Sequence, residues 1–201
     1  LQQMVQHIYA SAKNAHNLFK NLSVWSRMQR GLMEYHPSQI NLSVLVNDTV
    51  ELLREIALSK NIELANNIAS NMSVYADKNM LDTVIRNLSS NELQFTPPGG
   101  RVTISTEPSH SSPEFVEVLI SDTGVGISEE DLKKLFRLDV HHTTAGTAQE
   151  KGTGLGLIIC QEMVEKNGGQ IWVESDGGPG QGTTVKFTVP LAVDCVPESY
   201  G

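Results

Sequence analysis

The sequence contains few cysteines and no cluster of basic residues. Its 201 residues include two cysteines, Cys160 and Cys195, which form neither a C-x-x-C pair nor a disulfide framework. We therefore expect a reduced, cytoplasmic setting. The formal net charge is −8, and no run of lysine or arginine is present. These features exclude a nucleic-acid partner, because nucleic-acid binding depends on clustered basic side chains that displace counterions.

Long apolar runs and the most familiar nucleotide motifs are also missing. No apolar stretch approaches the length of a membrane-spanning helix, and no signal-peptide pattern opens the chain. There is no G-x-x-x-x-G-K-[ST] loop, and the glycine cluster around Gly154 follows a polar run instead of the buried strand of a dinucleotide-binding fold. The chain begins with Leu1 inside a helical pattern, which indicates a fragment of a longer protein whose membrane or sensing segments would lie upstream.

A long N-terminal helix is the first predicted element. Mostly apolar residues alternate at spacings of three and four from Leu1 to Leu32, with Ser11 and Gln29 as interruptions, and this pattern is typical of a heptad seam. We expect the seam to pack on another chain, giving a homodimer, or on a helix that the fragment lacks. A helix lying on its own domain is the alternative. The helix is expected to end before Pro37.

Helical and strand patterns alternate through the rest of the chain and predict one α/β domain plus an appendage. A helix over residues 41–60 is expected to bury Leu45, Val46, Leu52, Leu53 and Ile56. A helix over residues 77–95, capped by Asp77, is expected to bury Leu81, Val84, Ile85 and Leu88. Strands are expected over residues 62–65, 74–76, 101–106, 115–122, 170–175 and 183–189.

A glycine cluster runs directly into a further amphipathic helix, which starts at Leu155 and ends at Asn167. Gly152, Gly154 and Gly156 carry no Cβ, so the backbone can approach a bulky anion and the first N–H groups of the helix can point at it. The pattern predicts a phosphate cradle, with a plain flexible turn as the alternative.

Two further clusters of polar residues precede this helix. Asn87 and Asn91 lie four residues apart, on one face of the helix over residues 77–95. The strand over residues 115–122 ends in a D-x-G-x-G turn that begins at Asp122. After this turn, Ser128 is expected to cap a short helix that ends near Phe136.

In this order, the Asn-bearing helix, the D-x-G-x-G turn, the polar loop and the G-x-G-x-G helix start resemble the catalytic and ATP-binding domain of sensor histidine kinases. That domain belongs to the wider ATPase family that includes gyrase and the mismatch-repair ATPase. Four segments of this chain resemble the conserved boxes of that domain. RNLSSNELQFT (86–96) resembles the N box, and DTGVGI (122–127) resembles the first glycine box. LFRLD (135–139) resembles the phenylalanine box, and GTGLGL (152–157) resembles the second glycine box.

The resemblance implies an α+β fold, a two-layer α/β sandwich in which a mixed sheet of about five strands packs on three helices. It also implies the division of the chain. Residues 1–37 would be the second helix of a dimerisation and phosphoacceptor hairpin whose first helix is missing. Residues 38–192 would form the ATP-binding catalytic domain, and residues 193–201 would be a tail.

The resemblance also implies how ATP and Mg²⁺ are held. Asn91 offers a neutral amide oxygen to Mg²⁺, an ion that keeps most of its waters. Asp122 only accepts hydrogen bonds at neutral pH, so it suits the exocyclic amino group of adenine and repels the carbonyl oxygen of guanine. The resemblance also implies that the hydroxyl group of Thr184 contacts adenine. The full set of expected ATP-site residues is Asn87, Asn91, Phe95, Asp122, Gly124, Gly126, Ile127, Phe136, Gly152, Thr153, Gly154, Leu155, Gly156, Leu157 and Thr184. A structural role within the domain is the alternative for Asn87, and a core position is the alternative for Phe136.

The implied activity is that of a protein-histidine kinase, which passes the γ-phosphoryl group of ATP to a histidine and onward to an aspartate of a response-regulator receiver domain. Such an acceptor histidine is followed by an acidic residue, whereas His7 is followed by Ile8 and His16 by Asn17. We therefore expect the acceptor to lie upstream of the fragment, so that no catalytic residue is assigned here and the fragment is inactive alone.

Two residues of the N box depart from the family pattern. Glu92 and Gln94 stand where the family usually has Ala and Lys. These changes would lower the affinity for ATP, unless the charge of Glu92 points to solvent, and they motivate the alternative of a degenerate module that acts as a dimerising scaffold. A rival enzyme class, an ATPase of the wider family, would need a Glu in the N box to activate water, and Asn87 occupies the equivalent turn.

Overall fold

The computed structural model describes residues 12, 15, 18, 19, 21–136, 155–177 and 181–192. The elements follow one another along the chain as β1 (Pro37–Asn41), α2 (Leu42–Ser59), β2 (Glu63–Asn66), β3 (Ser73–Asp77), α3 (Lys78–Phe95), β4 (Arg101–Pro108), β5 (Phe115–Asp122), α4 (Glu129–Leu132), α5 (Gly156–Lys166), β6 (Ile171–Glu174) and β7 (Thr184–Pro190).

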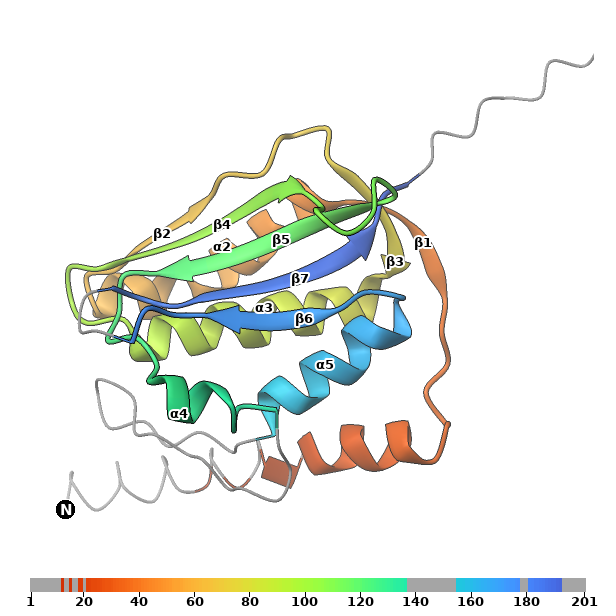
Figure 1. Cartoon of the computed structure of the whole chain (residues 1–201), viewed down its shortest axis with the longest axis horizontal. Helices are drawn as coiled ribbons and strands as arrows, with labels where there is room; N and C mark the ends of the chain where they lie inside the picture. Colours follow the sequence, from red (N-terminus) through yellow and green to blue (C-terminus); the bar gives the residue numbers. More distant parts are fainter. Residues whose placement is uncertain are drawn as a thin grey trace, which may run out of the picture.

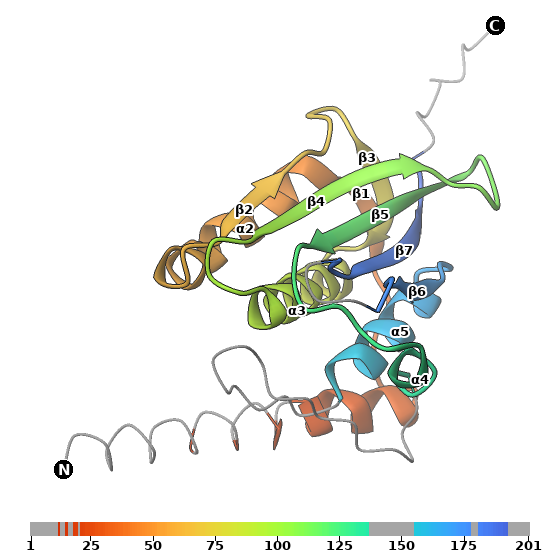
Figure 2. The same ribbon diagram turned by 60° about the vertical axis from the view of Figure 1, so that its left-hand side comes forward.

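Five strands form a mixed sheet in the order β2-β4-β5-β7-β6. The β2–β4 pair is parallel and the other three pairs are antiparallel. The helices α2, α3 and α5 lie together on one side of this sheet (Figures 1 and 2). The two-layer α+β sandwich predicted from the sequence is therefore confirmed.

A second, two-stranded sheet was not predicted. Strand β1 pairs antiparallel with β3, from Pro37 opposite Asp77 to Asn41 opposite Ser73. Pro37 was interpreted only as the stop of a helix. Proline is also tolerated at the first residue of a strand, because a missing N–H does not interrupt the ladder there.

The core lies between the sheet and the helices. Every second residue of β5, namely Val116, Val118 and Ile120, is buried on the helix side. The predicted stripe of α3 is confirmed, since all of its residues are at most 3% exposed, namely Leu81, Val84, Ile85 and Leu88.

The predicted buried face of α2 is wrong at two positions. Leu52 is 61% exposed and Ile56 is 46% exposed. The stripe that faces the core follows the helical period and includes the smaller residues Thr49 and Ala57. The other residues of this stripe are Leu42, Leu45, Val46 and Leu53. Size and hydrophobicity alone misplaced the face, because the stripe accepts Thr49 and Ala57 and leaves two larger apolar residues outside.

The predicted helix caps are confirmed. The Asp77 carboxylate accepts from the backbone N–H groups of Asn79 and Met80, and Ser128 accepts from the N–H of Asp131. Helix α4 is shorter than expected and ends at Leu132, followed by turns to Phe136. In the described part of the chain, no helix has the length and apolar character of a membrane span.

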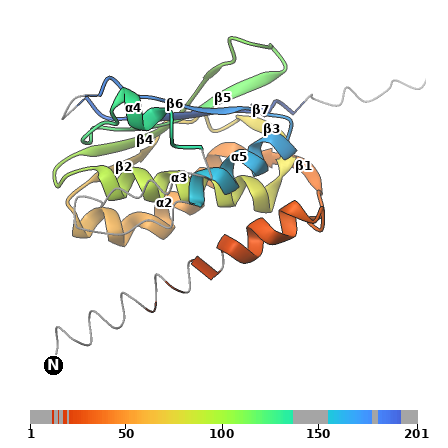
Figure 3. The same cartoon turned by 60° about the horizontal axis from the view of Figure 1, so that its bottom comes forward.

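The described part of the N-terminal helix packs on its own domain, below α5 (Figure 3). Val24, Trp25 and Met28 are partly buried against the core. Two seam positions, Leu18 and Leu22, remain 46% and 50% exposed. These contacts match the alternative interpretation, in which the helix lies on its own domain. The exposed seam residues leave apolar surface that a further partner could cover.

Candidate nucleotide-binding site

The candidate site forms where strand β5 and helix α3 end side by side. Gly124 follows Asp122 after the strand, and a Cβ placed on it would lie 2.6 Å from the backbone oxygen of Phe95, in the last turn of α3. Only glycine fits this approach. The D-x-G turn therefore lies directly against the end of the Asn-bearing helix.

Backbone donors from two segments hold the carboxylate of Asp122. The side chain is 8% exposed, and its Oδ2 atom accepts from the N–H of Thr183 at 2.9 Å. Its Oδ1 atom accepts from the N–H of Gly124. The backbone groups of Gly182 and Gly124 are also bonded, at 3.2 Å between N and O. These bonds tie the turn after β5 to the start of β7 and fix the orientation of the carboxylate.

A second carboxyl group lies against Asp122. Glu92 on α3 is 4% exposed, and its carboxyl group lies beside that of Asp122. Burial raises the pKa of Glu92 well above its ordinary value, and the neighbouring Asp122 raises it further. The expectation that its side chain points to solvent is therefore wrong, because the side chain is buried inside the domain.

The two asparagines of α3 lie in different surroundings. The side chain of Asn87 lies beside the thiol of Cys160, so it links α3 to α5, which matches its structural alternative. Burial raises the pKa of Cys160 to about 12, so this cysteine stays a thiol. Asn91, one turn further along α3, is half-buried and precedes Glu92 at the end of the helix where Asp122 lies.

The placement of Thr184 differs from the expectation. Thr184 lies opposite Ser121 in the ladder, and its hydroxyl group donates to that of Ser121 at 3.0 Å, on the sheet face away from the helices. Thr183 is 8% exposed and lies beside Asp122. Side chains alternate between the two faces of a strand, so the threonine on the helix side is Thr183. The period-two pattern of the strand was the sequence signal that separates these neighbours.

The expected apolar walls, Phe95, Ile127 and Phe136, are all partly exposed. The N–H of Ile127 donates to Ser175 at 2.9 Å, which holds the turn after Gly126 against the chain that follows β6. Gly126 has a φ of 73°, a left-handed conformation that favours glycine.

Helix α5 differs from α2, α3 and α4 at its start. Its N-cap residue, Leu155, provides no side-chain cap, whereas side chains cap the other three helices. Leu155, Gly156 and Leu157 are partly buried at this end. The expected cradle residues Gly152, Thr153 and Gly154 lie outside the described residues.

A cavity of about 550 Å³ lies close to this region but is separate from it. None of the expected ATP-site residues that the structure describes lines it, although the neighbouring Thr123 does. Its other walls come from the end of α2 and the starts of β2 and β4, namely Leu58, Asn61, Ile62, Glu63, Gly99, Gly100 and Arg101.

Comparisons with known proteins agree with this geometry. The sequence pattern of the histidine kinase-, DNA gyrase B- and HSP90-like ATPases matches residues 76–193. The adaptive-response sensory kinase SasA of Rippkaea orientalis is 32% identical over 194 residues, which cover 94% of this chain and 48% of that protein. SasA of Synechococcus elongatus is 34% identical over 160 residues, which cover 79% of this chain and 40% of that protein. The chain thus spans about half the length of the curated relatives it matches.

Solved structures show the same fold. A nucleotide-free catalytic domain of the histidine kinase ThkA has a TM-score of 0.65 at 29% identity, covering 79% of this chain and 97% of that chain. The histidine kinase AdeS of Acinetobacter baumannii has a TM-score of 0.75 at 16% identity, covering 96% of this chain and 86% of that chain. The chain belongs to the family of histidine kinase-, DNA gyrase B- and HSP90-like ATPases and carries the ATP-binding catalytic domain found in sensor histidine kinases.

Proposed function

We propose that this chain is the Mg-ATP-binding kinase core of a two-component sensor. One observation carries the proposal. The Asp122 carboxylate is held by two backbone donors at the end of β5, directly against the last turn of α3, which bears Asn91. A fixed, acceptor-only group at this place suits the exocyclic amino group of adenine.

The phosphates would lie between Asn91 and the start of α5. The first N–H groups of an uncapped helix suit an anion, and Leu155 provides no side-chain cap. Among the residues that the structure describes, no three His, Cys, Asp or Glu side chains gather as a metal site. The amide oxygen of Asn91 fits Mg²⁺, which binds through few protein ligands beside substrate phosphates and supplies charge neutralisation when bound.

Phosphoryl transfer asks the protein mainly for positioning and charge stabilisation. In this chain Asp122 would orient the purine, and the start of α5 would hold the phosphates. The γ-phosphoryl group would pass to a histidine of the hairpin to which residues 1–37 contribute one helix. A response-regulator aspartate would receive it next. The exposed seam residues Leu18 and Leu22 suit dimerisation of the parent protein, and the low cysteine content suits the cytoplasm.

The second candidate is a scaffold that has lost ATP. Two carboxyl groups meet at Glu92 and Asp122, and a cation expected near the phosphates is replaced by Gln94. The missing cation reduces the attraction for a polyanion. This candidate predicts that the domain stays folded but has no measurable affinity for the nucleotide.

Calorimetry with Mg-ATP separates the two candidates. The kinase proposal expects heat at micromolar to millimolar nucleotide, and its absence at millimolar concentration would leave only the scaffold. Transfer is tested by adding a protein that carries an acceptor hairpin and measuring acid-labile phosphate on it. Phosphate on this chain alone would show that His7 or His16 is the acceptor.

A further inference from the structure

The cavity of about 550 Å³ has no part in the proposed function. It lies where α2 ends and where β2 and β4 begin, and its volume is within the range of about 300–1,000 Å³ that is typical of small-molecule sites. Ile62, which is 5% exposed, and Leu58, which is 68% exposed, provide apolar surface. Gly99 and Gly100 add backbone that no side chain covers. The cavity therefore combines room for a small molecule with an apolar wall.

An ion pair lies in another wall of the cavity. Glu63 and Arg101 both line it and lie opposite each other in the ladder of β2 and β4. The Nε and Nη2 atoms of Arg101 each lie 2.9 Å from one oxygen of Glu63, Oε2. A guanidinium group has five N–H donors and a carboxylate has about four acceptor positions, so these two contacts leave capacity on both groups. The cavity thus presents a cation and an anion side by side.

We propose that this cavity binds a free amino acid with an apolar side chain. In the complex, the carboxylate of this zwitterion contacts Arg101 and its ammonium group contacts Glu63, so each charge has a partner. The apolar side chain lies against Leu58 and Ile62 and covers part of the exposed surface of Leu58. A simple anion is repelled by Glu63 and a simple cation by Arg101, so the pair favours a molecule that carries both charges.

Backbone contacts connect the cavity to the turn that follows β5. Thr123 lines the cavity and comes directly after Asp122. The N–H of Arg101 donates to the hydroxyl group of Thr123 at 2.9 Å, and the N–H of Thr123 donates to the backbone oxygen of Arg101 at 3.1 Å. A ligand at Arg101 changes the surroundings of both amides. Their NMR signals therefore report binding without any nucleotide, so the test is independent of the proposed function.

The test titrates L-leucine into the isotope-labelled chain and follows the amide signals of Arg101 and Thr123. Both signals should shift and saturate at millimolar leucine. Two analogues each lack one charge: N-acetyl-leucine has no ammonium group, and leucinamide has no carboxylate. Each should bind at least about tenfold more weakly than leucine, because one charged hydrogen bond is lost. The absence of a saturable shift with leucine would overturn the site, and equal binding of either analogue would overturn the recognition of a zwitterion.

Two variants assign the charges to their partners. E63Q should no longer prefer leucine to N-acetyl-leucine, and R101Q should no longer prefer leucine to leucinamide. R54Q is the matched control, because Arg54 forms a similarly exposed ion pair with Glu51, at 3.3 Å, and neither residue lines the cavity. It should keep both preferences. Preferences that persist in E63Q and R101Q would overturn the assignment, and the analogues test the same contacts in the unmodified chain if a variant fails to fold.

Discussion

Two glutamates of this protein have the same small exposed area, and their pKa values move in opposite directions. Glu92, on the helix side of the sheet, and Glu117, on the open side, are each 4% exposed. The pKa of Glu92 is raised by burial and by Asp122. The pKa of Glu117 is lowered, first by the N–H of His110, which donates at 2.9 Å, and this outweighs burial. Equal exposed area therefore does not fix the pKa of a carboxyl group here: burial inside the domain has the largest influence on Glu92, and the N–H of His110 has the largest influence on Glu117.

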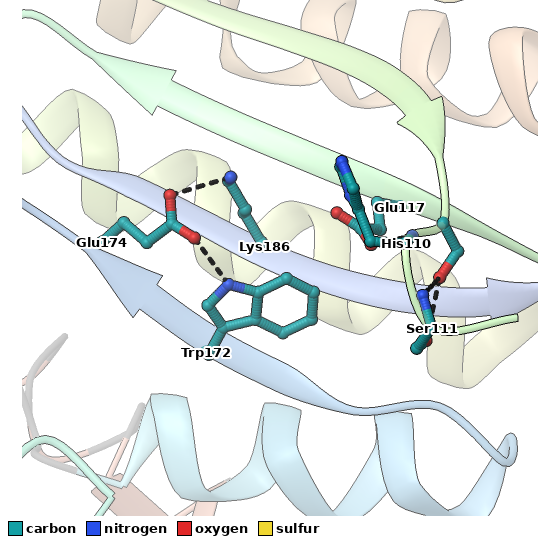
Figure 4. A network of polar contacts seen from close by, with 7 residues as sticks. His110, Ser111, Glu117, Trp172, Glu174 and Lys186 are labelled. Atoms are coloured by element: carbon teal, nitrogen blue, oxygen red, sulfur yellow. Dashed lines mark hydrogen bonds and ion pairs between the residues drawn. The ribbon is translucent and has the colours of Figure 1, made fainter.

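The same contrast separates the two faces of the sheet. On the open face, carboxylates meet donors: Lys186 and the ring N–H of Trp172 both contact Glu174, at 2.8 Å and 2.9 Å, and His110 lies at Glu117 (Figure 4). On the helix face, Asp122 meets backbone donors and a second acid. The open face is arranged as a stable ionic surface.

The largest effect is expected for D122N, a substitution on the helix face that should lower the affinity for nucleotide. D122N turns one acceptor oxygen into an NH₂ donor, which opposes the N–H of Thr183 or Gly124 and repels the purine amino group. We expect the affinity for a fluorescent ATP analogue to fall by at least about a hundredfold, because a buried polar group without a partner costs about 1–3 kcal/mol and the bond to the ligand is lost as well. E117Q, from the same strand, should bind normally. Unchanged affinity in D122N would remove adenine recognition from this end of β5.

A smaller effect is expected for a neutral polar group on the helix face. Asn167 is 6% exposed, accepts from the N–H of Asp77 at 2.7 Å and donates to the backbone oxygen of Met163 at 2.8 Å. N167A should lower the free energy of unfolding by about 2–3 kcal/mol, because both buried backbone groups lose a partner. Urea denaturation measures this. Q170A, at an exposed position nearby, should stay within about 0.5 kcal/mol of the unmodified chain.

The open face provides a pH-dependent effect of about 1 kcal/mol. A carboxyl group whose pKa is lowered by folding stabilises the fold above its unfolded pKa, near the ordinary value of 4.5, and loses this contribution as the pH falls through the folded pKa. E117Q should therefore be about 1 kcal/mol less stable than the unmodified chain at pH 7, since the charged hydrogen bond to His110 is lost. The difference should vanish at acidic pH, below the folded pKa of Glu117, where both side chains are neutral. A difference that persists there would mean that shape, and not charge, holds this turn.

Most elements of the fold follow from local patterns in the sequence. The stripe from Leu81 to Leu88 and the caps Asp77 and Ser128 depend on neighbours three or four residues away, so periodicity predicts them. The buried faces of α2 and β7 were harder to predict. Whether Leu52 or Thr184 faces the core depends on which neighbouring element covers that face, and such a contact joins residues far apart in the sequence.

Glu92 shows what the sequence leaves open at the site. The resemblance to the family identified it as a departure, and the sequence shows its distance along α3 from Asn91. Its burial depends on β5 carrying Asp122 to the end of α3, which is a contact across 30 residues. Only the folded structure shows that the carboxyl group of Glu92 is buried beside that of Asp122.

The smallest effect should come from the most exposed carboxylate of the comparison, Glu174. Its side chain is 55% exposed, its pKa is lowered mainly by the hydrogen bond from Lys186, and water screens the pair. E174Q should change the free energy of unfolding by less than about 0.5 kcal/mol, measured by urea denaturation, and about 1 M salt should remove the difference. Glu117 and Glu174 both accept hydrogen bonds from nearby donors and differ in exposure. If E174Q lowered the free energy of unfolding as much as E117Q, exposure would not influence the contribution of a carboxylate on this face. The chemistry of the partner alone would then decide how much each carboxylate stabilises the fold.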